Sequence, residues 1–307
     1  MRYFAILILV NLMWAFQFSG AKIAAAQLGP VAVAFLPMAI ATLLLSPLLL
    51  IGHPPASRSH FWYWTGQFFL LALFGPVPAQ LALVWGVERS LASNAAVINL
   101  SIPVVTAVMA AILVQEKMTR LRWISFALAI AGVLAVSHGD LGSAQLFDGK
   151  YLAGNALIFV SCCGSAFNNT YSKKLLRTFR PIDVLVYGFA ASDIILLPLM
   201  LVLEPDAALR LASLARPAWL SLGLIAVFSL SLSMLLFLWV IDRIDVTRAS
   251  LSIYLLPVFG VILSSVTLHE TISPSLAAGG ALVFVSTFLV TFHEESNRRA
   301  AVRKCNA

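Results

Sequence analysis

A long internal repeat constrains the fold of this chain more than any other feature of its sequence. Three residues of the first half recur 151 positions later, with Lys22, Pro30 and Pro47 matching Lys173, Pro181 and Pro198. Four more recur 154 positions later, with Trp85, Arg89, Pro103 and Glu116 matching Trp239, Arg243, Pro257 and Glu270. One loop that differs by three residues explains the change of register. A repeat of this length predicts two related halves.

The chain is too apolar for its halves to fold in water. Of its 307 residues, 61% are hydrophobic and only 11% are charged, whereas about 25% charged residues is usual in soluble domains. The mean hydropathy is +0.94. Since a soluble core cannot bury this much apolar surface, the lipid bilayer is the expected surroundings for most of the chain.

Blocks of about 20 apolar residues, the length that spans a bilayer, divide the chain into ten segments. The expected helices cover roughly residues 3–25, 31–51, 61–87, 93–115, 120–138, 152–175, 182–203, 217–241, 247–269 and 274–293. We therefore predict an all-α integral membrane protein with ten transmembrane helices. The repeat divides it into residues 1–145, residues 146–296 and a basic cytoplasmic tail, residues 297–307.

Five spans per repeat is an odd number, so the second half enters the membrane from the opposite side. The sequence thus predicts two inverted five-helix repeats related by a pseudo-two-fold axis in the membrane plane. Proteins of this kind bind substrate near the bilayer midplane, between the halves. Polar residues in the middle of the spans are therefore the candidates for a binding site.

The net charge of +7 is explained by topology and not by nucleic acid, which we exclude as a partner. With the N-terminus inside, five of the 20 Lys and Arg residues lie outside, namely Lys22, Arg89, Lys150, Arg210 and Arg216. The other fifteen lie on the inner side, where positive charge concentrates. Both termini are expected to be cytoplasmic, in a bacterial cytoplasmic (inner) membrane.

Polar residues in the first helix and in its repeat partner, the sixth, are the first candidates for a substrate cavity. They are Asn11, Trp14 and Gln17 in the first and Asn168 and Asn169 in the sixth. At about 100° per residue, Asn11, Trp14 and Lys22 share one face. Alternatively, these amides form hydrogen bonds between helices, as is common in membrane bundles. Lys22 and Lys173 would then extend to the two membrane–water interfaces and not into a cavity. Both interpretations remain open.

Four prolines interrupt three further spans and are candidates for hinges. Pro76 and Pro78 stand at the centre of the third helix, whereas Pro103 and Pro257 occupy equivalent positions in the fourth and ninth. Proline removes an amide donor and kinks a helix. A static kink that aids packing is the alternative. Polar neighbours of these prolines complete the predicted cavity: Gln80, Asn99, Ser101, Ser252 and Tyr254.

Asp193 is a carboxylic acid near the middle of the predicted seventh helix, and Thr42 takes its place in the second. A carboxylate at this depth is costly unless it is paired, protonated or hydrated. Asp193 either bonds a neighbouring helix as a neutral acid or exchanges protons during transport. Lys22 and Lys173 are the other candidates for charge or proton coupling.

The sequence offers no constellation for catalysis or metal binding. The three cysteines lack metal-ligand spacing, and the five histidines lie at predicted helix ends or loops without an HExxH pattern. We expect no cofactor, no metal and no enzymatic activity. A membrane-embedded enzyme or a sensor is the alternative outside transport, and a channel fits mid-span prolines less well than alternating access does.

The arrangement resembles the drug/metabolite transporter superfamily, specifically its ten-helix EamA-type branch. The matching features are the proline-centred helix from Asn94 through Pro103 to Glu116, its repeat from Ala249 through Pro257 to Glu270, and the segment around Trp14. The resemblance implies a central cavity lined by the first, third, fourth, sixth, eighth and ninth helices. It also implies metabolite transport, without naming a substrate.

A secondary-active, alternating-access transporter of small polar metabolites is the function that these features favour. Amides, hydroxyls and aromatic rings with few fixed charges suit amino acids or related zwitterionic compounds, moved outward. Organic cations or amines are the alternative, held by aromatic faces with Asp193 as counter-charge. The transporter is expected to be a monomer or a homodimer.

The predicted topology can be tested by labelling single cysteines in a cysteine-free background. Because Gly142 and Ala208 fall in outer loops, cysteines there should react with an impermeant reagent applied outside intact cells. Cysteines at Ser59, Arg120 and Arg299 should not. External labelling at Arg299 would contradict a cytoplasmic C-terminus.

Overall fold

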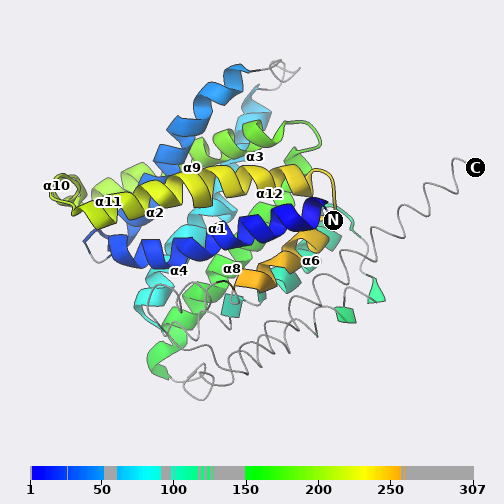
Figure 1. Ribbon diagram of the computed structural model, residues 1–307, viewed down its shortest axis with the longest axis horizontal. Coiled ribbons are helices and arrows are strands. Elements are labelled where there is room, and N and C mark those ends of the chain that lie inside the picture. Colours follow the sequence, from blue (N-terminus) through cyan, green and yellow to red (C-terminus); the bar gives the residue numbers. More distant parts are fainter. Residues whose placement is uncertain are drawn as a thin grey trace, which may run out of the picture.

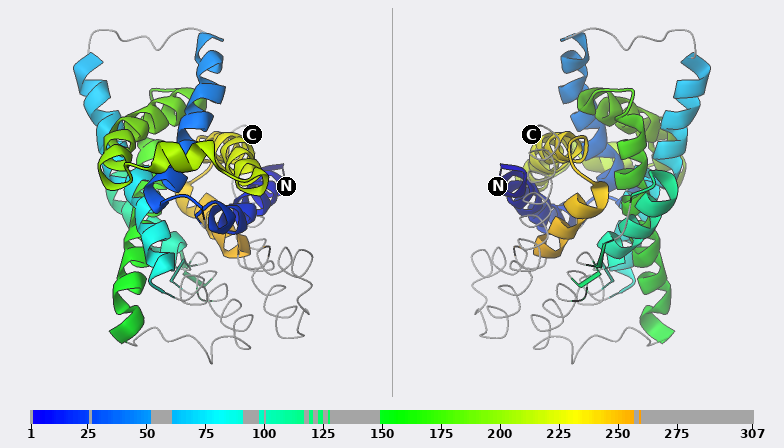
Figure 2. Two further views of the ribbon diagram at one scale, coloured as in Figure 1. Left: turned by 90° about the vertical axis from the view of Figure 1, so that its left-hand side faces the viewer. Right: turned by 90° about the vertical axis from the view of Figure 1, so that its right-hand side faces the viewer.

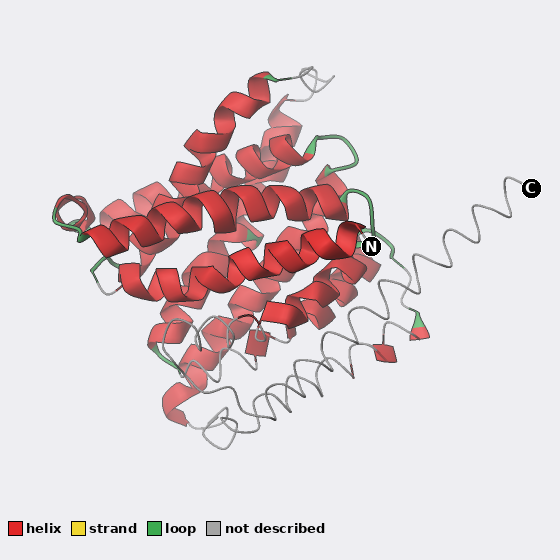
Figure 3. Ribbon diagram, in the orientation of Figure 1, coloured by secondary structure: helices red, strands yellow, loops and turns green. Residues whose placement is uncertain are grey.

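A computed structural model gives the fold of the chain (Figure 1). It describes residues 2–25, 27–51, 61–90, 98–99, 101–116, 119–120, 123–124, 127, 149–256 and 259, without the side chains of Phe18, Ser19, Lys22, Val87 and Lys150. All regular secondary structure in these residues is helical (Figure 3). The predicted all-α class is confirmed, while the helices expected at 120–138 and 274–293 lie outside or almost outside the described residues.

The helices begin and end close to the predicted positions. In the first half they are α1 (Arg2–Ala25), α2 (Pro30–Leu45), η1 (Ser46–Leu50), α3 (Phe61–Phe74), α4 (Pro76–Glu88) and α6 (Ser101–Leu113). In the second half they are α8 (Gly149–Leu175), α9 (Pro181–Leu203), α10 (Ala207–Ala212), α11 (Arg216–Leu224), η5 (Ile225–Leu232), α12 (Ser233–Ile241), α13 (Val246–Ser250) and η6 (Leu251–Tyr254). The short helix α10 was not predicted.

Five helical stretches of the described chain are long and apolar enough to cross a bilayer. They cover Pro30–Leu50, Phe61–Gly86, Tyr151–Leu175, Pro181–Leu203 and Arg216–Ile241, and two shorter apolar helices cover Arg2–Gln17 and Ser101–Leu113. Leucines that face outward on these helices remain exposed, such as Leu43 and Leu50. Exposed apolar side chains on long helices are what lipid contact requires.

The start of α2 is held by a side chain from the other half of the chain. Pro30 begins the helix, and its repeat partner Pro181 begins α9 in the same way, because proline tolerates the first helical position. The Glu204 carboxylate accepts the backbone amides of Val31 at 2.8 Å and Ala32 at 2.9 Å. A Cβ at Gly29 would lie 2.1 Å from the Glu204 carboxyl carbon, so only glycine allows this cap.

The third and eighth predicted spans are both irregular at the same repeat position. In the first half, α3 and α4 are separated at Gly75, just before Pro76. In the second half, the π-helix η5 separates α11 from α12 over Ile225–Leu232, and Ser229 is the repeat partner of Gly75. Since π-helical turns and prolines displace backbone hydrogen bonds, both halves have a break near mid-span.

Helices from opposite halves pack against one another throughout the described bundle. The first-half helix α1 packs against α11, η5 and α12, whereas α4 and α6 pack against α8, and α2 packs against α9. Figure 1 shows α1 and α12 side by side, and the views in Figure 2 agree. The two halves therefore share one core and do not fold as separate bodies.

The contact between α4 and α8 depends on close approach of their backbones. A Cβ at Gly164 would lie 2.8 Å from the backbone nitrogen of Ala79 and 3.0 Å from the carbonyl oxygen of Gly75. Small residues allow helices in membranes to approach in this way, where dispersion replaces the hydrophobic effect. Gly164 thus fixes the distance between the two helices at the level of the break.

We expect Gly164→Ala to destabilise the protein by about 1–3 kcal/mol, the usual cost of overpacking a tight core, because backbone atoms cannot move aside as a flexible side chain can. Equilibrium unfolding in mixed detergent micelles measures the change. Gly66→Ala and Gly223→Ala are matched controls, since a Cβ at either meets no atom within 4 Å. Equal stability of all three variants would contradict this account of the α4–α8 contact.

Candidate functional site

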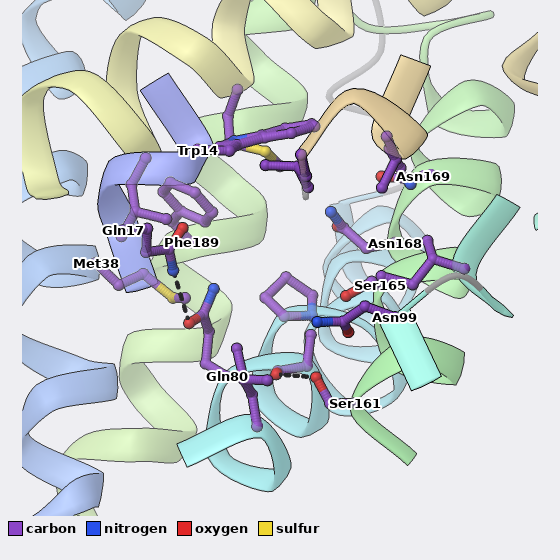
Figure 4. Close-up of a pocket in the computed structure, with 18 residues that line it drawn as sticks. Trp14, Gln17, Met38, Gln80, Asn99, Ser161, Ser165, Asn168, Asn169 and Phe189 are labelled. Atoms are coloured by element: carbon purple, nitrogen blue, oxygen red, sulfur yellow. Dashed lines mark hydrogen bonds between the residues drawn. The ribbon is translucent and has the colours of Figure 1, made fainter. Parts of the chain in front are cut away.

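A cavity of about 140 Å³ lies between helices of both halves (Figure 4). One water needs about 10–15 Å³ by this measure, so the space holds roughly ten waters or one small metabolite. The described residues that line it are Trp14, Gln17, Met38, Pro76, Ala79, Gln80, Leu83, Asn99, Ile102, Ser161, Ser165, Asn168, Asn169, Phe189, Leu230, Met234, Ile253 and Leu256. None of them is charged.

One wall of the cavity is polar and comes mainly from α8. Ser165 is three or four residues away from each of Ser161, Asn168 and Asn169, which places these side chains along one face of the helix. Asn99 adds an amide from the neighbouring segment. Figure 4 shows Asn99 and Asn168 extending from this wall toward the centre of the cavity.

The amides of this wall are largely uncommitted. Neither Asn168 nor Asn169 has a side-chain hydrogen bond to any other part of the described chain. Asn99 accepts one bond from the Cys162 thiol, with 3.3 Å between sulfur and oxygen. Ser161 differs, because its hydroxyl donates to the Ala79 carbonyl at 2.6 Å. The asparagines therefore keep donors and acceptors for a ligand.

The opposite wall is mostly apolar. Trp14, Met38 and Phe189 lie here, with Leu230 and Met234 from the second half. Figure 4 shows Met38 and Phe189 facing the asparagines across the space. Met38 and Phe189 are themselves equivalent in the repeat, 151 positions apart, so both halves supply this apolar surface.

Gln17 and Gln80 connect α1 with α4 along the edge of the cavity. The Gln17 amide nitrogen donates to the Gln80 amide oxygen over 3.2 Å (Figure 4). Because each glutamine has further donors and acceptors, a polar ligand has groups to bond here without breaking the bridge.

Trp14 is held rigidly at one end of the cavity. Its indole nitrogen donates to the Ser229 carbonyl at 3.2 Å, and the Ser229 hydroxyl donates to the Met13 carbonyl at 2.8 Å. The Trp14 and Phe237 rings are 5.1 Å apart between centroids. These bonds join α1 to the π-helix and fix the orientation of an aromatic face toward the cavity.

The serines of the π-helix satisfy the irregular backbone around it. The Ser231 hydroxyl donates to the Ala226 carbonyl at 2.7 Å, and the Ser233 hydroxyl donates to the Ser229 carbonyl. Unpaired backbone groups are costly in the membrane interior. Both hydroxyls therefore bond backbone carbonyls that the irregular helix leaves available.

Six of the ten predicted cavity residues line the cavity: Trp14, Gln17, Gln80, Asn99, Asn168 and Asn169. Asn11, Ser101, Ser252 and Tyr254 do not. Asn11 is fully buried, and its amide donates to the Leu7 carbonyl at 2.7 Å and to the Ser252 hydroxyl at 2.9 Å. Tyr254 is only 1% exposed. The structure thus places Asn11 and Ser252 in a contact between α1 and η6.

The predicted hinge prolines occupy different surroundings. Pro76 lines the cavity directly after the break at Gly75. Pro78 lies two residues further along α4, outside the lining, and Pro103 is buried in α6. Pro257 lies outside the described residues. Sequence reasoning did not include Met38, Phe189, Leu230 and Met234, because apolar residues in a span carry no local sign of facing a cavity.

Lys173 lies at a helix end and not in the cavity. Its ammonium group donates to the carbonyls of Ile241, of Asp242 at 3.3 Å and of Ile244 at 3.1 Å, at the C-terminal end of α12. A cation at a helix C-terminus satisfies free carbonyls and interacts favourably with the helix dipole. Its repeat partner Lys22 has no described side chain.

Glu116 makes the complementary contact at a helix N-terminus. Its carboxylate accepts the backbone amides of Val246 at 2.7 Å and Thr247 at 3.1 Å, at the start of α13. The Arg177 guanidinium donates to the Val114 carbonyl at 3.5 Å. Together with Lys173, these contacts tie α6, α8, α12 and α13 to one another at one end of the bundle.

A second, polar cavity of about 400 Å³ is lined by charged side chains, unlike the described lining of the first. Its lining includes Trp85 and five charged residues, namely Glu88, Arg89, Glu204, Asp206 and Arg210. Glu204 also caps α2, as described above. No group of three or more metal-ligating side chains occurs in the described part of the chain.

Comparison with known proteins identifies the family. The model of the EamA-like transporter family matches residues 1–138 and again residues 152–292. The chain is a member of this family. The two matches cover most of the chain, one in each half of the repeat, and the resemblance inferred from the sequence is confirmed.

Two similar proteins of low sequence identity are described as transporters. An uncharacterized transporter of Archaeoglobus fulgidus is 25% identical over 291 residues, which cover 94% of this chain and 99% of that protein. A probable terminal-alkyne amino-acid exporter of Streptantibioticus cattleyicolor is 25% identical over 225 residues, 72% of this chain and 71% of that protein. These relatives, like the family, indicate an integral membrane transporter.

The fold also matches a solved structure. A protein known from a crystal structure superimposes with a TM-score of 0.76, covering 95% of this chain and 96% of that chain, at 16% sequence identity. At this identity the likeness concerns the fold alone. The arrangement of helices across both halves is therefore shared by a protein of very different sequence.

The contrast between Asn11 and Asn168 gives a testable prediction. Asn11→Ala removes two buried hydrogen bonds and should lower the free energy of unfolding by about 1–3 kcal/mol. Asn168→Ala should leave stability within about 0.5 kcal/mol, because this amide has no bond to the described chain. Unfolding in mixed micelles compares the two, and a stability loss confined to Asn168→Ala would reverse the assignment.

Proposed function

We propose that this protein is a secondary-active, alternating-access transporter that exports amino acids or related small zwitterionic compounds. The observation that carries the proposal is the cavity, where free asparagine amides face an apolar wall and no described lining residue is charged. The protein would act in a bacterial inner membrane, with both termini cytoplasmic, as its charge distribution suggests.

Amides suit a zwitterion because each offers both kinds of hydrogen-bonding group. An asparagine or glutamine side chain has a carbonyl acceptor and two N–H donors. The acceptors can bond an ammonium group and the donors a carboxylate. Since Asn168 and Asn169 have no competing bonds within the described chain, one ligand can use both.

The absence of charged side chains from the described lining argues against solutes with a large net charge. Moving such an ion out of water is costly unless opposite charges compensate it. A zwitterion carries its own compensation. The apolar wall of Trp14, Met38 and Phe189 further favours a solute with an apolar part. The relative named as an amino-acid exporter agrees with this reading.

Alternating access is supported by equivalent contacts in the two halves. Arg89 donates to the Trp85 carbonyl at 3.0 Å, and their repeat partners Arg243 and Trp239 make the same contact at 2.7 Å. The breaks at Gly75 and in η5 are also equivalent. Inverted repeats of this kind exchange their conformations during transport, and the prolines next to the breaks would act as hinges.

An organic cation or amine is the second candidate, because the Trp14 face borders the cavity and aromatic faces attract cations. Asp193, the counter-charge that this reading needs, lies outside the described lining and bonds Thr42 instead. The amine reading is therefore the weaker of the two.

Binding measurements on purified protein test the proposal. Asn168→Ala or Asn169→Ala should weaken binding of a neutral amino acid about 10- to 150-fold, which corresponds to the roughly 1.5–3 kcal/mol of a hydrogen bond to a charged group. Gln27→Ala is the matched control, because this amide is exposed and its described bond is to the Ala215 backbone.

A competition experiment separates the two candidates. Amino acids should displace a bound labelled amino acid and should drive counterflow in proteoliposomes, whereas organic cations should not. If quaternary or primary amines compete and amino acids fail to, the amine reading replaces the one proposed here.

A further inference from the structure

Asp193 and Thr42 form a hydrogen bond between α9 and α2, at equivalent positions of the repeat. The Thr42 hydroxyl oxygen is 2.6 Å from one carboxyl oxygen of Asp193, and the two residues are 151 positions apart. The same hydroxyl oxygen is 3.0 Å from the Met38 carbonyl, one turn back in α2. The second carboxyl oxygen of Asp193 is buried without a hydrogen-bond partner.

The number of protons available to these contacts decides whether Asp193 is protonated or ionised. A threonine hydroxyl has one proton to donate, yet Thr42 has two acceptors in reach, the Met38 carbonyl and Asp193. Both contacts become hydrogen bonds only if Asp193 is protonated. The acid then donates to Thr42, and Thr42 donates to the Met38 carbonyl.

The charges around Asp193 lead to the same conclusion. The described elements that pack against α9 are α2, η1, α3, α4 and α12. Their sequences contain no lysine, arginine or histidine, and their one acid, Glu88, ends α4. Tyr63 lies at the exposed start of α3. Among these described elements, an ionised Asp193 would find one donor and no cation, which is costly inside a membrane.

Titratable groups on α9 itself lie away from this contact. Asp183 is ten residues back, about 15 Å along the helix, and it is paired with Arg180 at 2.7 Å. Tyr187 packs on Phe68, with 5.3 Å between ring centroids. Neither compensates a charge at Asp193.

We infer that Asp193 is a proton-binding site, occupied in this conformation and held by Thr42. Its ligand is a proton from water: a hydronium ion transfers H⁺ to the carboxylate, an O–H bond forms, and a water molecule is left. The reverse transfer occurs when α2 and α9 move apart far enough for water to reach the acid.

The position of the pair connects it to the cavity. Met38 and Phe189 line the cavity, and each lies one helical turn from the pair, Met38 before Thr42 and Phe189 before Asp193. A ligand that displaces either side chain also shifts α2 against α9. Proton release would then accompany a change in cavity occupancy. This second step rests on the proposed transport function, whereas the proton site does not.

Infrared spectroscopy of the purified protein tests the proton site without any substrate. At neutral pH, wild-type protein should show a protonated-carboxyl band that is lost in Asp193→Asn and retained in Asp206→Asn, an exposed loop acid. Thr42→Val should move the band to higher frequency, because the acid proton loses its acceptor, and Thr42→Ser should restore it. A wild-type spectrum without a band that depends on Asp193 would overturn the inference.

Flux measurements in proteoliposomes test the coupling separately. With a labelled neutral amino acid, an imposed pH gradient should accelerate wild-type transport and Thr42→Ser, but not Asp193→Asn, which should still bind the amino acid. A pH response that survives in Asp193→Asn would refute the coupling. If no amino acid is transported while the infrared band is present, the substrate proposal fails and the proton site stands.

Discussion

Satisfying backbone hydrogen bonds in an apolar environment is the constraint on which this structure depends. The spans that carry the breaks at Gly75 and in the π-helix expose backbone groups where water is scarce, and each break is covered by the opposite half. Gly164 allows α8 to reach the first break. Trp14 and Ser229 bond across the second. Irregular backbone inside a membrane is tolerated only under such cover, so the breaks themselves bring the halves together.

The same constraint explains where the few charged side chains go. Glu204 and Glu116 each accept two backbone amides at a helix start, and Lys173 donates to carbonyls at a helix end. Helix termini are the places where unpaired backbone groups accumulate. Because these charges act there, the described lining of the cavity contains only uncharged groups. The proposal of a neutral or zwitterionic solute rests on this uncharged lining.

Repeat symmetry gives the Asp193–Thr42 contact its special position. A residue that touches its own repeat partner lies where the two halves meet, and this contact joins α9 to α2. The two partners are chemically unequal, an acid and an alcohol. One half can therefore change its protonation while the other only adjusts a hydrogen bond. An asymmetric pair at a symmetric position is what the proposed alternating-access mechanism would use.

The sequence alone determined the fold class, the repeat, the approximate spans and the family, because apolar run length and proline spacing are local properties of the chain. It also identified Trp14, Asn168 and Asn169 on cavity-facing helices. Tertiary structure decided the rest. In the sequence, Asn11 and Lys173 are equally plausible cavity residues. In the structure, Asn11 bonds Ser252 in η6, and Lys173 bonds carbonyls at the end of α12. Polarity shows that a residue needs a partner, and only packing shows whether that partner is a ligand or another helix.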